Sequence, residues 1–119
     1  MSPVRSGAIH AFLAVATGAF GAHGLQHVLD EYSLKIWQTA ATYQLAHALA
    51  LLFVGLYEEQ RRTRLTLTHW AFSLGIVLFS GSLYALALTG VKALGMITPL
   101  GGVGFLVGWA ALAVRARRV

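Results

Sequence analysis

The chain has 119 residues, of which 57% are hydrophobic and only 11% are charged. A small soluble protein can hide little of its surface and needs a mostly polar exterior, which so few charged residues cannot supply. The net charge of +5 does not indicate a nucleic-acid-binding protein, because the basic residues lie between long apolar runs and not on one soluble face. Cysteine is absent, which excludes disulfides, thiolate metal sites and thiol catalysis. These totals indicate an integral membrane protein.

Four stretches of the chain contain no Asp, Glu, Lys or Arg: residues 6–29, 36–57, 65–91 and 93–114. About 20 helical residues cross a hydrocarbon core of about 30 Å, so each stretch is long enough to span a membrane. Backbone groups in lipid must be hydrogen-bonded internally, which requires helices. The sequence therefore predicts an all-α, integral membrane four-helix bundle. It forms a single domain, residues 1–119, with spans at about 6–27, 36–57, 66–89 and 94–114.

Residues 28–36, between the first two spans, combine Asp30, Glu31 and Lys35 with aliphatic and aromatic neighbours. This mixture predicts an interfacial turn or a short amphipathic helix. Alternatively, Ser33 caps an extended second helix. The first apolar run also resembles a signal peptide around Ala14, but it continues well past that point, as a membrane helix does.

The arginines predict the orientation of the four spans. With an even number of spans, both termini and the connection at 58–64 lie on one side of the membrane. That side carries seven of the nine basic residues: Arg5, Arg61, Arg62, Arg64, Arg115, Arg117 and Arg118. The other side carries only Lys35 and Lys92. This bias predicts that both termini are cytoplasmic in the bacterial cytoplasmic (inner) membrane, or on the matrix side in a mitochondrion.

Small residues recur at helical spacing in the first and fourth spans, where they would let helix backbones approach closely. These residues are Gly7, Ala14, Gly18 and Gly21 in the first span, and Gly101, Gly104, Gly108 and Ala111 in the fourth. Because lipid offers no hydrophobic drive for helix association, such stripes are typical of packing surfaces. We expect both stripes to contact neighbouring helices.

The second and third spans each have a polar face. At about 100° per residue, one face of the second span carries Ala40, Tyr43, Gln44, His47 and Leu51, opposite a leucine-rich face that is expected to contact lipid. The corresponding stripe of the third span is His69, Ser73, Val77, Ser80, Tyr84 and Ala87. We expect both faces to point into the bundle, where their polar groups hydrogen-bond across helices.

Polar groups at membrane depth are candidates for function. The ligand or polar-core candidates are His23, Tyr43, Gln44, His47, Ser80 and Tyr84. His23 and His27 are four residues apart, a spacing that suits two metal ligands, but no carboxylate accompanies them within a span. The simpler interpretation is that the histidines tie helices together. Whether His23 and His47 share a cavity depends on whether the first helix bends near Gly21 and Gly24.

The sequence contains no nucleophile with its base, no paired catalytic carboxylates and no zinc signature, so we expect neither an enzyme nor a cofactor. One hypothesis is a structural or accessory membrane protein that binds a lipid, a quinone or a larger membrane complex. The alternative is a small oligomeric transporter or channel with a polar path through Gln44, His47, Ser80 and Tyr84. The expected partners are membrane lipids and further copies of the chain or a membrane complex, not nucleic acid.

Several segments resemble the hallmark segments of a family of small membrane proteins, DUF 423, which includes the mitochondrial transmembrane protein 256 group. The similar segments are residues 18–24, 39–52, 79–84 and 97–102, followed by Gly108 and Trp109. They occur in the same order and spacing over nearly the whole chain. The resemblance implies a four-span inner-membrane protein and implies no biochemical activity.

Overall fold

The computed structural model describes residues 2–116, and this part of the chain is helical with no strand. Its helices are α1 (Pro3–His23), α2 (Glu31–Arg61), α3 (Thr66–Gly75), the π-helical segment η2 (Ile76–Ser80), α4 (Gly81–Thr89) and α5 (Thr98–Arg115). Short 3-10 turns, η1 (Leu25–His27) and η3 (Lys92–Met96), join them at one end. Because α3, η2 and α4 are continuous, we refer to them together as the α3–α4 rod. The prediction of an all-α protein with four helices is confirmed.

Three of the four helices are long and apolar enough to cross a membrane: Glu31–Arg61, Thr66–Thr89 and Lys92–Arg115. The other helix, α1, has 21 residues and therefore a length of about 31 Å. Its length is sufficient, so α1 falls outside this group because no stretch of it is apolar enough. Arg117 and Arg118, on which the predicted orientation also depends, lie outside the described residues.

The start of α2 differs from the expected interfacial turn or short helix at 28–36. The helix begins at Glu31 and runs unbroken to Arg61, and its cap is Asp30, not Ser33. The Asp30 carboxylate accepts a hydrogen bond from the Ser33 amide at 2.7 Å, so Ser33 supplies the amide that is capped. This hydrogen bond lowers the pKa of Asp30. Glu31 in the first turn is also favoured by the positive end of the helix dipole.

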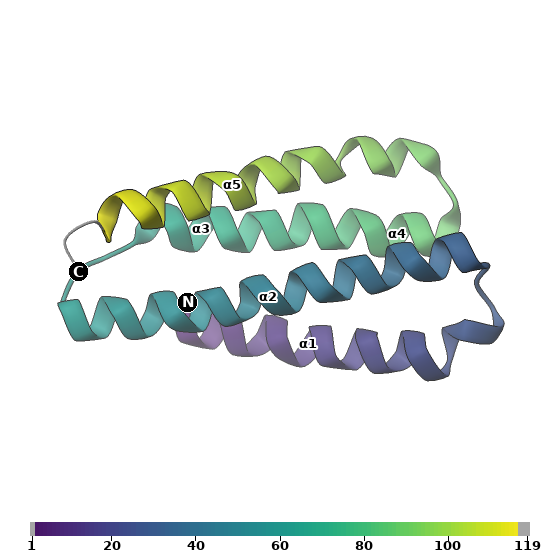
Figure 1. Cartoon of the computed structure of the whole chain (residues 1–119), viewed down its shortest axis with the longest axis horizontal. Coiled ribbons are helices and arrows are strands. Elements are labelled where there is room, and N and C mark those ends of the chain that lie inside the picture. Colours follow the sequence, from purple (N-terminus) through teal and green to yellow (C-terminus); the bar gives the residue numbers. More distant parts are fainter. Residues whose placement is uncertain (1, 117–119) are drawn as a thin grey trace.

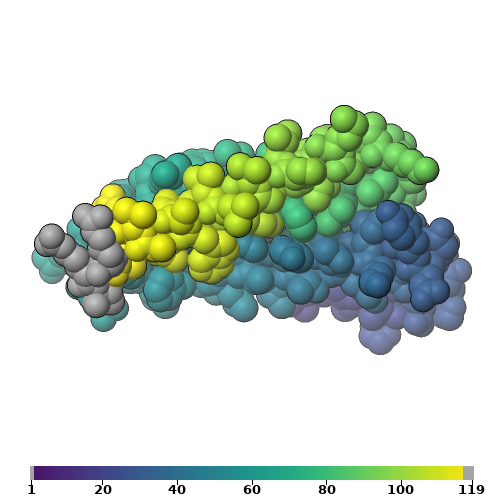
Figure 2. Space-filling view, turned by 45° about the horizontal axis from the view of Figure 1, so that its top comes forward, coloured from purple at the N-terminus to yellow at the C-terminus, as the bar shows by residue number. Residues whose placement is uncertain are grey.

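The helices pack in chain order, with α1 on α2, α2 on the α3–α4 rod, and the rod on α5 (Figure 1). The molecule measures 48 × 26 × 21 Å, and Figure 2 shows this elongated shape with α5 running along its length. The start of α1, the turn between α2 and α3, and the end of α5 lie at the same end (Figure 1). Of the arginines on which the predicted orientation depends, Arg5, Arg61, Arg62, Arg64 and Arg115 belong to these segments.

The structure places the predicted packing glycines at helix contacts. In α1, a Cβ added to Gly7 would lie 2.7 Å from the Ala48 carbonyl oxygen of α2, and one added to Gly21 would lie 2.6 Å from Trp37 Nε1. Gly18 is less crowded, with Ala41 Cβ at 3.8 Å. In α5, Gly101, Gly104 and Gly108 face the α3–α4 rod, against Phe79, Ala71 and Phe72 respectively. Both glycine stripes therefore permit close backbone approach.

The inward face of the rod differs from the predicted stripe at Val77. That side chain is 57% exposed, whereas Ile76 is only 2% exposed. The reason is η2, because a π-helical turn winds less per residue than the 100° assumed for a regular helix. Within η2 the inward residues are Ile76 and Ser80, and Phe72 of α3 continues the same row.

Candidate functional site

Two hydrogen-bonded polar clusters lie in the middle of the bundle. In the first, the Tyr84 hydroxyl donates to Gln44 Oε1 at 2.7 Å and lies 2.8 Å from the Thr17 hydroxyl. Gln44 Nε2 donates in turn to the His10 carbonyl oxygen at 3.0 Å. Trp37 Nε1 donates to the Thr17 carbonyl oxygen at 2.7 Å. This cluster joins α1, α2 and α4, and it uses both ends of the Gln44 amide.

The second cluster surrounds His47, which is 6% exposed. Its Nε2 accepts a hydrogen bond from Trp109 Nε1 at 3.0 Å, and its Nδ1 lies 2.8 Å from the Tyr43 carbonyl oxygen. An indole N–H can only donate, so Nε2 carries the lone pair and Nδ1 carries the proton. The ring is stacked on Phe105 with the ring centroids 3.6 Å apart. His47 is therefore held as a neutral imidazole with both nitrogens occupied.

The remaining polar candidates of the second and third helices have different surroundings. Ser80 is buried and donates to the Ala40 carbonyl oxygen at 2.7 Å, which ties the rod to α2. Tyr43 is 44% exposed and its ring packs against Phe79, with the centroids 4.7 Å apart. The structure thus brings Gln44 and Tyr84 into contact and places His47 in a separate aromatic contact with α5.

His23 and His27 lie far from these clusters. His23 is the exposed last residue of α1, and His27 is exposed in η1, where its Nε2 lies 3.3 Å from Gln26 Nε2. The hydrogen bond between Gln44 and His10 places His47 near the level of His10, 13 residues along α1 from His23, or about 20 Å at 1.5 Å per residue. His23 and His47 therefore do not share a cavity. Within residues 2–116, no three His, Asp or Glu side chains are grouped to hold a metal ion.

A large cleft lies at the arginine-rich end, and the sequence analysis did not identify it. It has a volume of about 910 Å³, within the range of about 300–1,000 Å³ that is usual for small-molecule sites. The cleft exists because α1 begins opposite Gly55, where Val4 contacts α2, while α2 continues to Arg61. The last turns of α2 are consequently not covered by α1. The charged and aromatic residues that line the cleft are Glu58, Glu59, Arg62, Arg64, His69 and Trp70.

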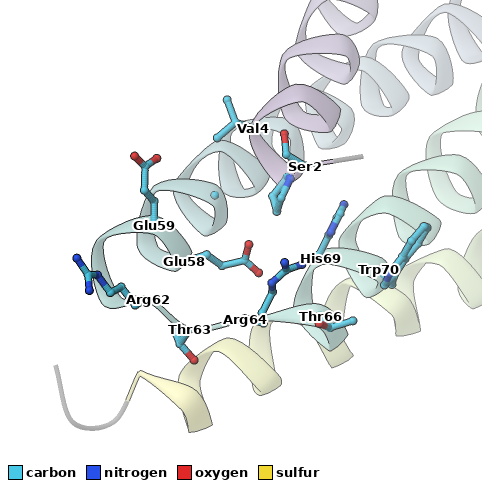
Figure 3. A pocket seen from close by; sticks show the side chains of 12 residues that line it. Ser2, Val4, Glu58, Glu59, Arg62, Thr63, Arg64, Thr66, His69 and Trp70 are labelled. Carbon is cyan, nitrogen blue, oxygen red and sulfur yellow. The ribbon is translucent and has the colours of Figure 1, made fainter.

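The side chains of Glu58, Arg64 and His69 point toward the middle of the cleft, and Arg62 points away from it (Figure 3). Glu58 Oε2 accepts a hydrogen bond from the Leu65 amide at 2.6 Å. This contact fixes Glu58 at the start of α3 and leaves its other carboxylate oxygen toward the cleft. Trp70 lies at the rim and is 54% exposed.

An apolar groove adjoins the cleft between α3 and α5. Its volume is about 470 Å³, and its lining includes Leu65, Thr66, Val107, Ala110, Ala111 and Val114. Thr66 lines both the groove and the cleft. Arg115 at the end of the groove donates to the Thr63 hydroxyl at 3.0 Å, and Thr63 lines the cleft. The two cavities are therefore neighbours, one charged and one apolar.

Comparison with known proteins confirms the family resemblance. Residues 17–102 match the family described as "Protein of unknown function (DUF423)". The chain is 48% identical over 108 residues to a UPF0382 membrane protein of Staphylococcus aureus (strain bovine RF122), covering 91% of this chain and 88% of that protein. It is 46% identical over 112 residues to the UPF0382 membrane protein YwdK of Bacillus subtilis (strain 168), covering 92% of this chain and 91% of YwdK. No solved structure matches the chain.

Proposed function

This chain belongs to the DUF423 family of proteins of unknown function, and from that premise we propose that it is a non-catalytic accessory protein of the bacterial cytoplasmic membrane that binds a membrane lipid. Its bacterial relatives are named membrane proteins, and three of its helices are long and apolar enough to cross a bilayer. The observation that carries lipid binding is the charged cleft beside an apolar groove. This combination suits an amphipathic ligand, because its polar and apolar parts would each meet matching surface.

The position of the cleft supports a lipid over a free solute. Trp70, at its rim, is a residue type that anchors proteins at the membrane–water interface. The adjoining groove exposes aliphatic side chains along α5, including Val107 and Val114. A lipid headgroup in the cleft would therefore stay at the interface while its chains remained in the hydrocarbon layer.

We further propose that α1 also crosses the membrane, with both termini cytoplasmic. Its length of about 31 Å matches the hydrocarbon thickness of about 30 Å. Close contacts at Gly7 and Gly21 hold it against α2 over most of its length. Four crossings put Arg5, Arg64 and Arg115 on one side, and the positive-inside rule makes that side cytoplasmic.

Cysteine accessibility tests this topology, because the natural chain has no cysteine. Single cysteines replace Ser2, Gln26 and Gln60 in separate variants, and intact cells are treated with a membrane-impermeant maleimide. We expect Gln26→Cys to be labelled in intact cells, and Ser2→Cys and Gln60→Cys only after lysis. If Ser2→Cys is labelled from the same side as Gln26→Cys, α1 does not cross the membrane.

The transport hypothesis receives less support from the arrangement of its four residues. Gln44 and Tyr84 hydrogen-bond each other, Ser80 donates to a backbone carbonyl, and both His47 nitrogens are occupied. These groups join helices through direct contacts. The three cavities described within residues 2–116 are lined by other residues. A homo-oligomer or a larger membrane complex remains a proposal for the protein's partners.

Lipid retention tests the proposed function. After purification in mild detergent, we expect the protein to keep a stoichiometric phospholipid, measured by extraction and quantification against protein. Arg64→Gln should lower that amount, because the Arg64 guanidinium lines the cleft and can contact a phosphate. Lys35→Gln, at the other end of α2, is the matched control and should leave it unchanged. Wild-type protein without retained lipid would contradict lipid binding.

A further inference from the structure

The cleft carries charges of both signs in equal number. Its lining contains the carboxylates of Glu58 and Glu59 and the guanidinium groups of Arg62 and Arg64. Of these four, Glu58 and Arg64 point toward the middle of the cleft, and Glu59 and Arg62 point away from it (Figure 3). A purely anionic headgroup there would meet the Glu58 carboxylate, and a purely cationic one would meet the Arg64 guanidinium. A zwitterionic headgroup can satisfy both signs at once, so the charge balance favours this class of ligand.

The placement of these charges suits a short zwitterion. Figure 3 shows the Glu58 carboxylate and the Arg64 side chain extending from different elements toward the middle of the cleft. In an ethanolamine headgroup, a two-carbon link joins the phosphate to a primary ammonium. The guanidinium can donate two parallel hydrogen bonds to the phosphate. A carboxylate binds a primary ammonium more strongly than a choline group, because the ammonium has N–H donors and the methylated nitrogen of choline has none.

The groove is positioned to hold an acyl chain from the same molecule. It shares Thr66 with the cleft and follows α5 from Arg115 to Val107. Eight residues of helix correspond to about 12 Å, most of the roughly 15 Å depth of hydrocarbon in one leaflet. A chain in this groove would begin beside the charged cleft, as the geometry of a glycerophospholipid requires.

From these observations we infer that the cleft and the groove together bind one aminophospholipid. Its phosphate lies toward Arg64, its primary ammonium toward Glu58, and one acyl chain lies between α3 and α5. This inference rests on the proposed lipid-binding function and names the lipid class.

Three phospholipids with identical acyl chains test the headgroup. Phosphatidylethanolamine, phosphatidylcholine and phosphatidylglycerol are added separately to the delipidated full-length protein in mild detergent, and the bound fraction is measured by native mass spectrometry. We expect phosphatidylethanolamine to bind about tenfold more tightly than either of the others, which is the effect of about one charge-assisted hydrogen bond. Equal binding of the three, or a preference for phosphatidylglycerol, would overturn the inference while leaving lipid binding itself intact. Binding of none would overturn both.

Glu58→Gln tests the ammonium contact. The glutamine carbonyl oxygen can still accept the Leu65 amide, so the start of α3 is preserved while the charge is removed. The Glu58→Gln variant should lose the preference for phosphatidylethanolamine and keep its affinity for phosphatidylcholine. The double variant, which also carries Glu59→Gln, should show no preference either. Glu31→Gln, at the other end of α2, controls for loss of a carboxylate elsewhere. A preference that survives the double substitution contradicts the assignment.

Ala110→Phe tests the acyl-chain position, because Ala110 lines the groove. We expect about tenfold weaker binding of phosphatidylethanolamine, comparable to the loss of about two buried methylene groups. Ala113→Phe on the same helix is exposed and is not a lining residue of the groove, so it should bind as wild type does. Equal binding by both variants would show that no chain occupies the groove. Unchanged circular dichroism and thermal stability show that each variant is folded.

Discussion

Gly101→Ala is expected to destabilise the protein by about 1–3 kcal/mol or more, the usual cost of overpacking a close contact. Gly101 is buried where α5 crosses the α3–α4 rod, and an added Cβ would lie 2.7 Å from Phe79 Cα. The obstacle is backbone, so no change of side-chain rotamer can relieve it. Either α5 must move away from the rod or η2 must deform.

The neighbouring Gly102 offers a matched control for this substitution. It lies on the same helix, and a Cβ there would meet only the edge of the Phe79 ring, at 4.0 Å. Gly102→Ala should be neutral or slightly stabilising, because alanine favours helix by up to about 1 kcal/mol over glycine. Thermal unfolding in mild detergent, followed by circular dichroism, compares the two. Equal midpoints would show that the contact of α5 with Phe79 is not as close as described.

The helices and their packing glycines were predictable because the lipid environment restricts the backbone structures that a chain can adopt. A charge-free run long enough to cross a bilayer must satisfy its own backbone hydrogen bonds, and helices do so. Small residues at helical spacing then indicate where two backbones meet, as Gly7 and Gly101 do. Both inferences need only the order of residues along one helix.

Features that depend on irregular local winding or on a second helix were not predictable in this way. The outward position of Val77 follows from the local π-helical winding of η2, which a constant 100° per residue does not represent. The cleft exists because the first residues of α1 lie opposite Gly55, while α2 continues to Arg61, so α1 does not cover the last turns of α2. That offset is set by the contacts between the two helices. The sequence showed the charges of Glu58 and Arg64 but not the space between them.

The prediction for His47 also depended on an unseen neighbour. Its polar face on α2 was readable from helical spacing, but its tautomer is determined by Trp109, 62 residues later in the chain. Because the indole donates to Nε2, the imidazole acts as a link between α2 and α5. This assignment gives a structural role to a residue that could otherwise have been taken for a proton carrier.

His47→Ala should therefore destabilise the protein by about 2–4 kcal/mol, from the cavity left beside Phe105 and the unpaired indole N–H. His23→Ala, an exposed histidine, should change stability by no more than about 0.5 kcal/mol. Trp109→Phe should cost about 0.6–1.5 kcal/mol in the wild-type background and less in His47→Ala, because the two substitutions remove the same hydrogen bond. Unfolding in detergent of the wild type, the two single variants and the double variant measures the coupling of this double-mutant cycle. Additive effects would show that the hydrogen bond contributes nothing.

The same His47→Ala variant separates the structural role from transport. If His47 only links helices, liposomes that contain the folded variant should leak protons and ions at the same rate as wild-type liposomes and as empty ones. A flux that wild-type protein carries, that His47→Ala loses and that His23→Ala retains would instead support transport along the polar path through Gln44 and Tyr84. Since both nitrogens of His47 are occupied by α2 and α5, a proton could pass only if the Trp109 hydrogen bond opened. Such opening would separate α5 from α2, so a real flux should rise in Trp109→Phe.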